Sequence, residues 1–96
     1  MARLIWTIQA ANDLEHIYEY IAKDSVKYAR IEIRRIQDRV KLLKRHPKSG
    51  RIITEIEVKQ LREIISGRFR IIYRIKSENN IEIISIHHSA KLLKFD

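Results

Sequence analysis

Arginine and histidine side chains in two apolar stretches are the residues of this chain best suited to chemistry. Residues 59–76 carry arginines in a strand-forming context, and residues 81–88 end in two consecutive histidines. Histidine can act as a general acid or base near neutral pH, and arginine can stabilise the charge that develops on a phosphorane. Such a set suits metal-independent RNA cleavage by a 2′-hydroxyl. The candidate catalytic residues for that reaction are Arg62, Arg70, His87 and His88.

The alternation of side chains along a strand decides which of these groups can meet. Successive strand residues point to opposite faces of a sheet. Two sets result, an apolar set of Phe69, Ile71, Tyr73 and Ile75 and a cationic set of Arg68, Arg70, Ile72 and Arg74. We expect Arg62, from the neighbouring strand, to lie on the same face as Arg70 and Arg74, with all three exposed. Only one of the two consecutive histidines can share that face.

Two residues near the arginines allow a structural or a chemical interpretation. Tyr73 belongs to the apolar set, so we expect a packed aromatic side chain unless a bulge turns it outward. Glu63 is either a base or the counter-ion of an arginine, and the counter-ion is the commoner role. Between Lys59 and Lys76 it is the only acidic residue against six lysines and arginines. This surface is therefore expected to attract a polyanion or an acidic partner.

Other reaction classes lack the residues that they need. The chain has no cysteine, no Gly-rich phosphate loop, no HExxH motif and no nucleophile elbow. Adjacent histidines project to opposite faces of a strand, whereas metal ligands converge on one point. We therefore expect neither a metal nor another cofactor.

Length and composition indicate one folded domain over residues 1–96 with a strongly basic surface. The 96 residues are 45% hydrophobic and carry a net charge of +8, which is typical of proteins that bind nucleic acid, an acidic protein or an anionic surface. No apolar run approaches the ~20 residues that span a bilayer, and the N-terminus lacks the pattern of a signal peptide. We expect a cytoplasmic protein that does not bind membranes.

Hydrophobic periodicity predicts an α+β fold. The expected elements are an edge strand at 3–8, helices at 10–23 and 25–46, an ambiguous segment at 52–58, a hairpin that turns at Ser66-Gly67, and a last strand at 81–88. Ser25 is the expected N-cap of the second helix. The order predicts an N-terminal strand, an antiparallel helical hairpin and an antiparallel β-meander.

The second helix has an apolar stripe and a basic remainder. The stripe consists of Val26, Ala29, Ile33, Ile36, Val40 and Leu43. Between Lys23 and Arg51 there are eleven lysines and arginines against three acidic residues, mostly off this stripe. A solvated helix face is the simplest interpretation of that charge.

Several motifs, in order, resemble one family over about 90 residues. They are W-T-x-x-A-x-x-D-L-x-x-I-x-x-Y-I at 6–21, P-K-S-G-R at 47–51, L-R-E-I at 61–64, G-R-F-R-I-I-Y at 67–73 and I-x-I-H-H-S-A-K at 84–91. With these motifs the chain resembles the RelE/ParE superfamily of type II toxin–antitoxin toxins. The resemblance implies a growth-inhibiting toxin that a cognate antitoxin neutralises with an acidic or amphipathic segment.

The superfamily has two branches, and the end of this chain resembles one of them. RelE-like members cut mRNA on the ribosome, whereas ParE-like members act on DNA gyrase without being nucleases. Residues 88–91, H-S-A-K, are similar to the ParE-like ending H-x-x-R with lysine for arginine, and the His-Tyr ending of one RelE-like branch is missing. The resemblance favours a ParE-like gyrase inhibitor. A ribosome-dependent mRNA endoribonuclease is the alternative, and a non-toxic basic nucleic-acid-binding module is a second one.

The same resemblance implies residues that contact the target or the antitoxin. These are Arg62, Arg68, Arg70, Arg74, His88 and Lys91.

Overall fold

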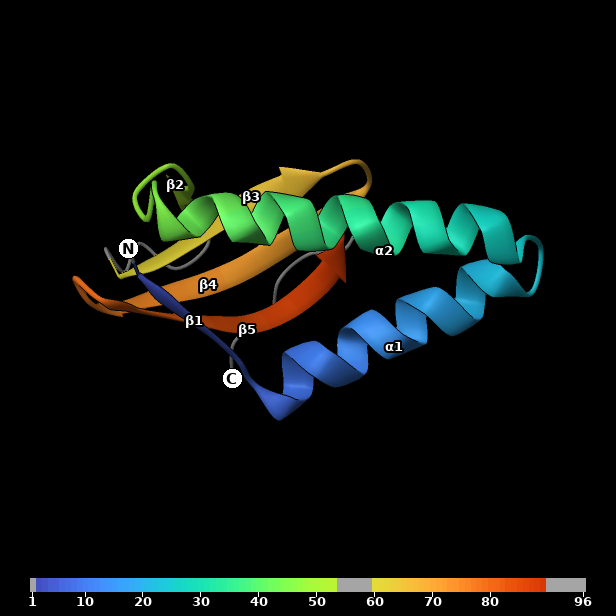
Figure 1. The fold of residues 1–96 in the computed structure, drawn as a ribbon, viewed down its shortest axis with the longest axis horizontal. Coiled ribbons are helices and arrows are strands. Elements are labelled where there is room, and N and C mark those ends of the chain that lie inside the picture. The colour runs from blue at the N-terminus through green and yellow to red at the C-terminus, as the bar shows by residue number, and fades with distance from the viewer. Residues whose placement is uncertain (1, 54–59, 90–96) are drawn as a thin grey trace.

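In the computed structural model, two helices pack on one face of a five-stranded sheet (Figure 1). The structure describes residues 2–53 and 60–89. Its elements are β1 (Arg3–Trp6), α1 (Ile8–Ala22), α2 (Val26–Lys41), the 3₁₀ helix η1 (Leu42–Lys44), β2 (Arg51–Ile52), β3 (Leu61–Ser66), β4 (Phe69–Ser77) and β5 (Asn80–His88). The predicted α+β class and order of elements are confirmed. Most of the ambiguous segment 52–58 lies outside the described residues.

The sheet has the order β1-β5-β4-β3-β2, so β4 is its central strand. Strands β2 to β5 form the expected antiparallel meander. The first strand lies at a sheet edge as predicted, but it pairs parallel to β5, with Arg3 opposite Asn80 and Trp6 opposite Ile83. The helical hairpin carries the chain across the sheet between these edges (Figure 1).

Side-chain caps set where the two helices begin. The hydroxyl of Ser25 accepts a hydrogen bond from the amide of Tyr28, which confirms the predicted N-cap of α2. The hydroxyl of Thr7 does the same for the amide of Ala10, so α1 starts at Ile8, two residues before the predicted position. None of the helices in the described parts of the chain is long and apolar enough to cross a membrane.

The main core lies between the helices and the sheet face that β4 turns toward them. Ile71 and Tyr73 of β4 are fully buried there with Ile36 of α2, and Phe69 and Ile75 pack at the edge of the cluster. The predicted apolar set of β4 is thereby confirmed. Val26 at the start of the predicted helix stripe is 46% exposed, because this end of α2 extends past the sheet (Figure 1).

A β-bulge in β5 changes which of its side chains face the helices. Tyr73 pairs with Ile83 but Ile72 pairs with Ser85, so Ile84 is an extra residue in β5. Beyond this point Ile86 faces the core and His87 faces the opposite side with Arg70. The bulge therefore decides which histidine shares a face with the arginines of β4.

Two side chains from the N-terminal part of the chain hold the bulged segment in place. The strand β1 ends at Trp6, so within residues 2–53 and 60–89 no strand pairs with this edge of β5 beyond Ile83. Thr7 Oγ1 donates to the carbonyl of Ile84 over 2.9 Å, and Asp13 Oδ2 accepts the amide of Ile86 over 2.9 Å. These bonds replace the missing ladder and attach α1 to the bulge.

We predict that Asp13→Ala destabilises the fold by about 1–3 kcal/mol, because the part-buried amide of Ile86 loses its acceptor. Urea unfolding measures the effect. The matched control is Asp24→Ala, since Asp24 is exposed at the end of α1, and its expected effect is within about 0.5 kcal/mol. Equal losses in the two variants would contradict the assigned role of Asp13.

Candidate functional site

The sheet face away from the helices carries a buried carboxylate between two arginines. Glu63 is 2% exposed. The Nε of Arg51 donates to its Oε1 over 2.6 Å, and the Nε of Arg70 donates to its Oε2 over 2.7 Å. A second ion pair joins Arg70 Nη2 to the same oxygen. Glu63 is thus the counter-ion of Arg51 and Arg70, which confirms the commoner of its two predicted roles.

The same face holds a small apolar cluster instead of a continuous cationic surface. Ile53 and Ile72 are fully buried in it, and Leu61 and Ile84 pack against them. Arg70 is only 8% exposed. The prediction that Arg70 is an exposed group is therefore wrong, because Glu63 binds its guanidinium within the face. A guanidinium that is buried away from water needs an oppositely charged partner of this kind.

Arg62 lies on the opposite face of the sheet from Arg70. The hairpin pairs Arg62 with Tyr73, whose side chain belongs to the helix-facing core. The Nη1 of Arg62 donates to the carbonyl of Gly50 over 2.9 Å and to that of Lys48 over 3.4 Å. Its Nε is buried and has no hydrogen-bond partner in the part of the chain that the structure describes. The predicted cluster of Arg62 with Arg70 and Arg74 is therefore wrong.

The hairpin register explains this placement. The turn consists of Gly67 and Arg68, one residue later than predicted, and Ser66 pairs with Phe69. A two-residue turn makes each even-numbered residue of β3 face an odd-numbered residue of β4. The φ of Gly67 is +58°, the left-handed conformation that such a turn requires at its first position.

Tyr73 anchors the loop of residues 47–50. Its hydroxyl donates to the carbonyl of Pro47 over 2.6 Å and accepts the amide of Gly50 over 2.9 Å. Burial raises the pKa of Tyr73, opposed by the hydrogen bond from Gly50 and by the charge of Arg62. A Cβ on Gly50 would lie 2.5 Å from this hydroxyl, so the loop needs glycine there. Tyr73 is the packed aromatic that the sequence predicted.

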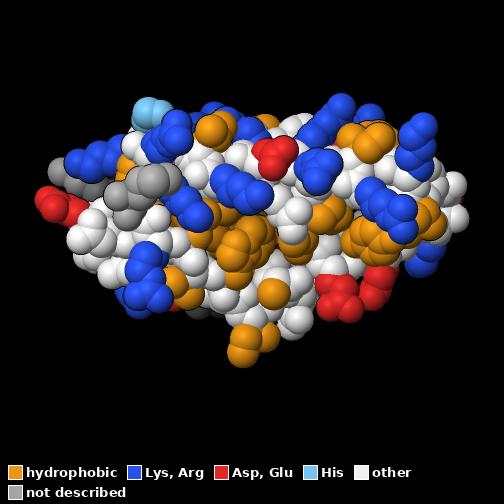
Figure 2. All heavy atoms as spheres, viewed as in Figure 1, with side chains coloured by type: hydrophobic (Ala, Val, Ile, Leu, Met, Phe, Trp, Pro, Cys, Tyr) orange, Lys and Arg blue, Asp and Glu red, His pale blue; other side chains and the backbone are white. Residues whose placement is uncertain are grey.

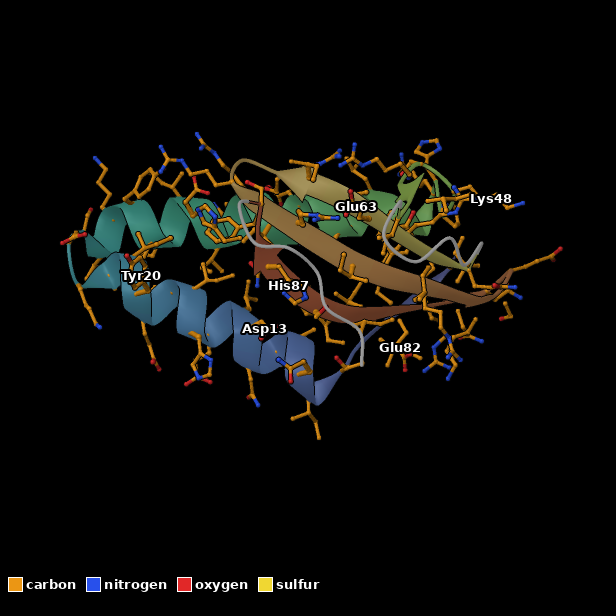
Figure 3. All side chains as sticks on the ribbon, turned by 180° about the vertical axis from the view of Figure 1, so that it is seen from behind. Asp13, Tyr20, Lys48, Glu63, Glu82 and His87 are labelled. Carbon is orange, nitrogen blue, oxygen red and sulfur yellow. The ribbon has the colours of Figure 1, made fainter. Side chains whose placement is uncertain are left out.

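The two histidines point to different faces, as expected. His87 lies opposite Arg70 on the outer face, with 2.8 Å between its Nε2 and Ser85 Oγ (Figure 3). His88 packs edge-to-face on Phe69, with ring centroids 5.9 Å apart. Only His87 therefore shares a face with an arginine of β4. Within residues 2–53 and 60–89, no three His, Cys, Asp or Glu residues are grouped to hold a metal ion.

The remaining predicted contact residues lie at the surface or outside the described residues. Arg68 is exposed at the hairpin turn, and Arg74 is exposed on the outer face. Lys91 lies outside the described residues. A groove between α1, α2 and the hairpin turn is lined by Arg68 and by atoms of both His87 and His88, together with Tyr20 and Tyr28, which are 73% and 51% exposed.

Three structurally important residues were not recognised from the sequence. Arg51 neutralises Glu63, Asp13 binds the β5 bulge and Ser85 contacts His87. Arg51 and Asp13 do belong to motifs quoted above, but no spacing rule connects positions that are so far apart in the chain. Ser85 could have been found only with knowledge of the bulge.

Comparison with known proteins places this fold among the small toxins of the RelE/ParE superfamily. A model of the ParE toxin of the parDE type II toxin–antitoxin system matches residues 4–93. The chain belongs to this ParE toxin family, and such toxins have an antitoxin as partner.

Individual relatives agree with this assignment. The chain is 30% identical over 87 residues to Y4kP of Sinorhizobium fredii, with 91% of this chain and 88% of the relative covered. It is 29% identical over 92 residues to Toxin RelE2 of Caulobacter vibrioides, covering 96% of this chain and all of the relative. A solved chain of the chromosomal ParDE system from P. aeruginosa is similar with a TM-score of 0.75 and 29% identity, over 92% of this chain and 96% of that one.

We predict that Glu63→Gln lowers the free energy of unfolding by about 3 kcal/mol, because the buried guanidinium of Arg70 loses its counter-ion. Chemical denaturation measures this loss. Glu78→Gln removes the same charge at an exposed position and is the control, with an expected effect within about 0.5 kcal/mol. A Glu63→Gln protein as stable as wild type would show that the ion pair contributes nothing.

For Tyr73→Phe we predict a loss of about 1–3 kcal/mol below pH 10, because a buried amide and a carbonyl lose their shared partner. The pKa of Tyr73 is raised in the folded state from its usual 10.0, so only the unfolded chain ionises as the pH first exceeds 10. This ionisation lowers the free energy of unfolding of the wild type, whereas Tyr73→Phe has no hydroxyl at this position to ionise. The stability difference between them should shrink above pH 10.

Denaturant melts between pH 8 and 11 measure this difference, in the range where tyrosines titrate (about pH 10). Tyr20→Phe, at an exposed position, serves as control and should parallel the wild type throughout. A constant gap between wild type and Tyr73→Phe across this range would contradict the pH prediction.

Proposed function

We propose that this toxin inhibits growth by binding DNA gyrase and that it does not cleave RNA. The supporting observation is that the candidate nuclease residues are divided between the two faces of the sheet. Arg62 and Arg70 lie on opposite sheet faces and each already binds groups of the fold, Arg62 the 47–50 loop and Arg70 the carboxylate of Glu63. His87 and His88 also diverge. A general base and charge-stabilising groups must meet at one phosphate to cleave RNA.

The likeness to the ParDE system from P. aeruginosa supports the same choice of branch. In this proposal Arg68, Arg74 and His88 contact the gyrase or an acidic segment of the antitoxin, since they are exposed at the hairpin end and on the outer face. Arg62 and Arg70 hold the fold. Gyrase works in the cytoplasm, which is the location expected for this protein.

A RelE-like endoribonuclease is the second candidate, because two observations favour it. Toxin RelE2 of Caulobacter vibrioides is similar over its whole length. In addition, Arg70 and His87 are opposite each other in the register of β4 and β5 and could share one phosphate. The target experiment must therefore separate the two activities.

We predict that the purified toxin blocks supercoiling by gyrase or traps cleaved plasmid. Arg74→Ala should weaken the effect about tenfold if its charge contacts the target, as a lost charged contact of about 1.4 kcal/mol implies. Arg3→Ala, which removes an exposed cation from the edge strand β1, is the matched control and should act like wild type. Agarose gels of plasmid topoisomers measure both.

The same preparations are added to a translating extract, and the 5′ ends of the mRNA are mapped. Uncut mRNA together with inhibited gyrase supports the proposal. New cuts within codons, lost in His87→Gln while gyrase turns over normally, would establish the RelE-like alternative. Normal gyrase and intact mRNA at excess toxin would contradict both candidates.

A further inference from the structure

One side of α2 presents a row of cations opposite its buried face. Lys27, Arg30, Arg34 and Lys41 are all exposed. Their separations of three, four and seven residues place them on one stripe of a helix that turns 100° per residue. Ala29, Ile36 and Val40 are buried on the other side. Figure 2 shows lysine and arginine side chains gathered over α2 on this face of the molecule. We call these four residues the α2 stripe.

The described residues do not neutralise the stripe. No ion pair in the described parts of the chain involves any of its four members. Asp38 lies between Arg34 and Lys41 on this side of the helix, but it forms no ion pair with either within those parts. Glu32, the other acidic residue of α2, is buried and binds Arg35 beside the stripe.

This arrangement does not favour the stability of the helix. Like charges three or four residues apart repel each other on a helix surface, and Lys27, Arg30 and Arg34 form two such pairs in succession. A set of charges that only kept the protein soluble would not need this alignment. The alignment therefore indicates a linear anionic partner.

We propose that the α2 stripe binds the phosphate backbone of duplex DNA. From Lys27 to Lys41 the stripe extends about 21 Å at a rise of about 1.5 Å per residue. Duplex DNA carries one phosphate charge about every 1.7 Å of its axis when both strands are counted, so this length of duplex offers more phosphates than the four cations need. Exposed lysines and arginines along a straight element are the groups that make such contacts.

Duplex DNA fits this surface better than the other polyanions. The stripe projects from the convex side of a helix, and the B-DNA major groove, about 12 Å wide, admits a helix between its two phosphate walls. The corresponding groove of A-form RNA is too narrow for that. The core of a protein–protein interface is depleted in charged residues, whereas the four stripe positions are all charged and the exposed apolar residues Ile31 and Leu42 lie beside them.

The inference goes beyond the proposed action on gyrase and does not depend on it. Direct DNA binding by α2 can exist whether or not gyrase is the target. Conversely, gyrase inhibition through Arg68 and Arg74 requires no contact between α2 and DNA.

The test is fluorescence anisotropy of a labelled DNA duplex titrated with the full-length toxin. For four phosphate contacts the logarithm of the affinity should fall with the logarithm of salt concentration with a slope of about −3.6, between about 50 and 200 mM salt. Arg30→Ala/Arg34→Ala removes two contacts, so its slope should be shallower by about 1.8. Its thermal stability should equal or exceed that of wild type, because repulsion is relieved and alanine favours helix.

Arg3→Ala/Lys76→Ala is the matched control, since it removes two exposed cations outside α2. Its slope should equal that of wild type. Equal slopes for the two double variants, or no DNA binding by the wild type, would overturn the inference. So would duplex RNA or polyglutamate that binds the stripe more tightly than DNA at equal salt. The gyrase assay, run on the same variants, separates failure of this inference from failure of the proposed target.

Discussion

The buried carboxylate of Glu63 is the constraint on which the outer face of the sheet depends. A carboxylate that is 2% exposed must be neutralised, and two arginines do this from different elements. Arg70 from β4 and Arg51 from β2 are thereby attached to β3. The apolar cluster around Ile72 closes the same face. The positive charge of Arg70, which the sequence predicts to be exposed, is therefore bound by Glu63 within the fold.

On the other face of the hairpin, polar side chains also bind groups of the fold. Arg62 and Tyr73, paired across β3 and β4, bind three carbonyls and one amide of the 47–50 loop. Both are residue types that a toxin of the ribonuclease branch could use on RNA. Here their polar groups hold a loop against the sheet. The polar groups of Arg62 and Tyr73 are therefore bound within the fold.

The positive charge that a partner can reach lies on exposed surfaces of the hairpin and of α2. Arg68 and Arg74 are exposed at the hairpin turn and on the outer face, and the α2 stripe is exposed on the helical layer. These surfaces lie on different elements, so the exposed positive charge is divided among separate parts of the protein. The net charge of +8 then reflects several surfaces and not one site.

Local patterns in the sequence determined the elements, the N-cap Ser25 and the apolar side of β4, because periodicity and capping act over a few residues. They also determined that the two histidines diverge, and the ordered motifs identified the superfamily. Only the tertiary structure decided the parallel partner of β1, which histidine shares the face of Arg70, and the burial of Arg70. Register, a single-residue bulge and ion pairs between distant strands set these features. They depend on contacts that no local pattern encodes.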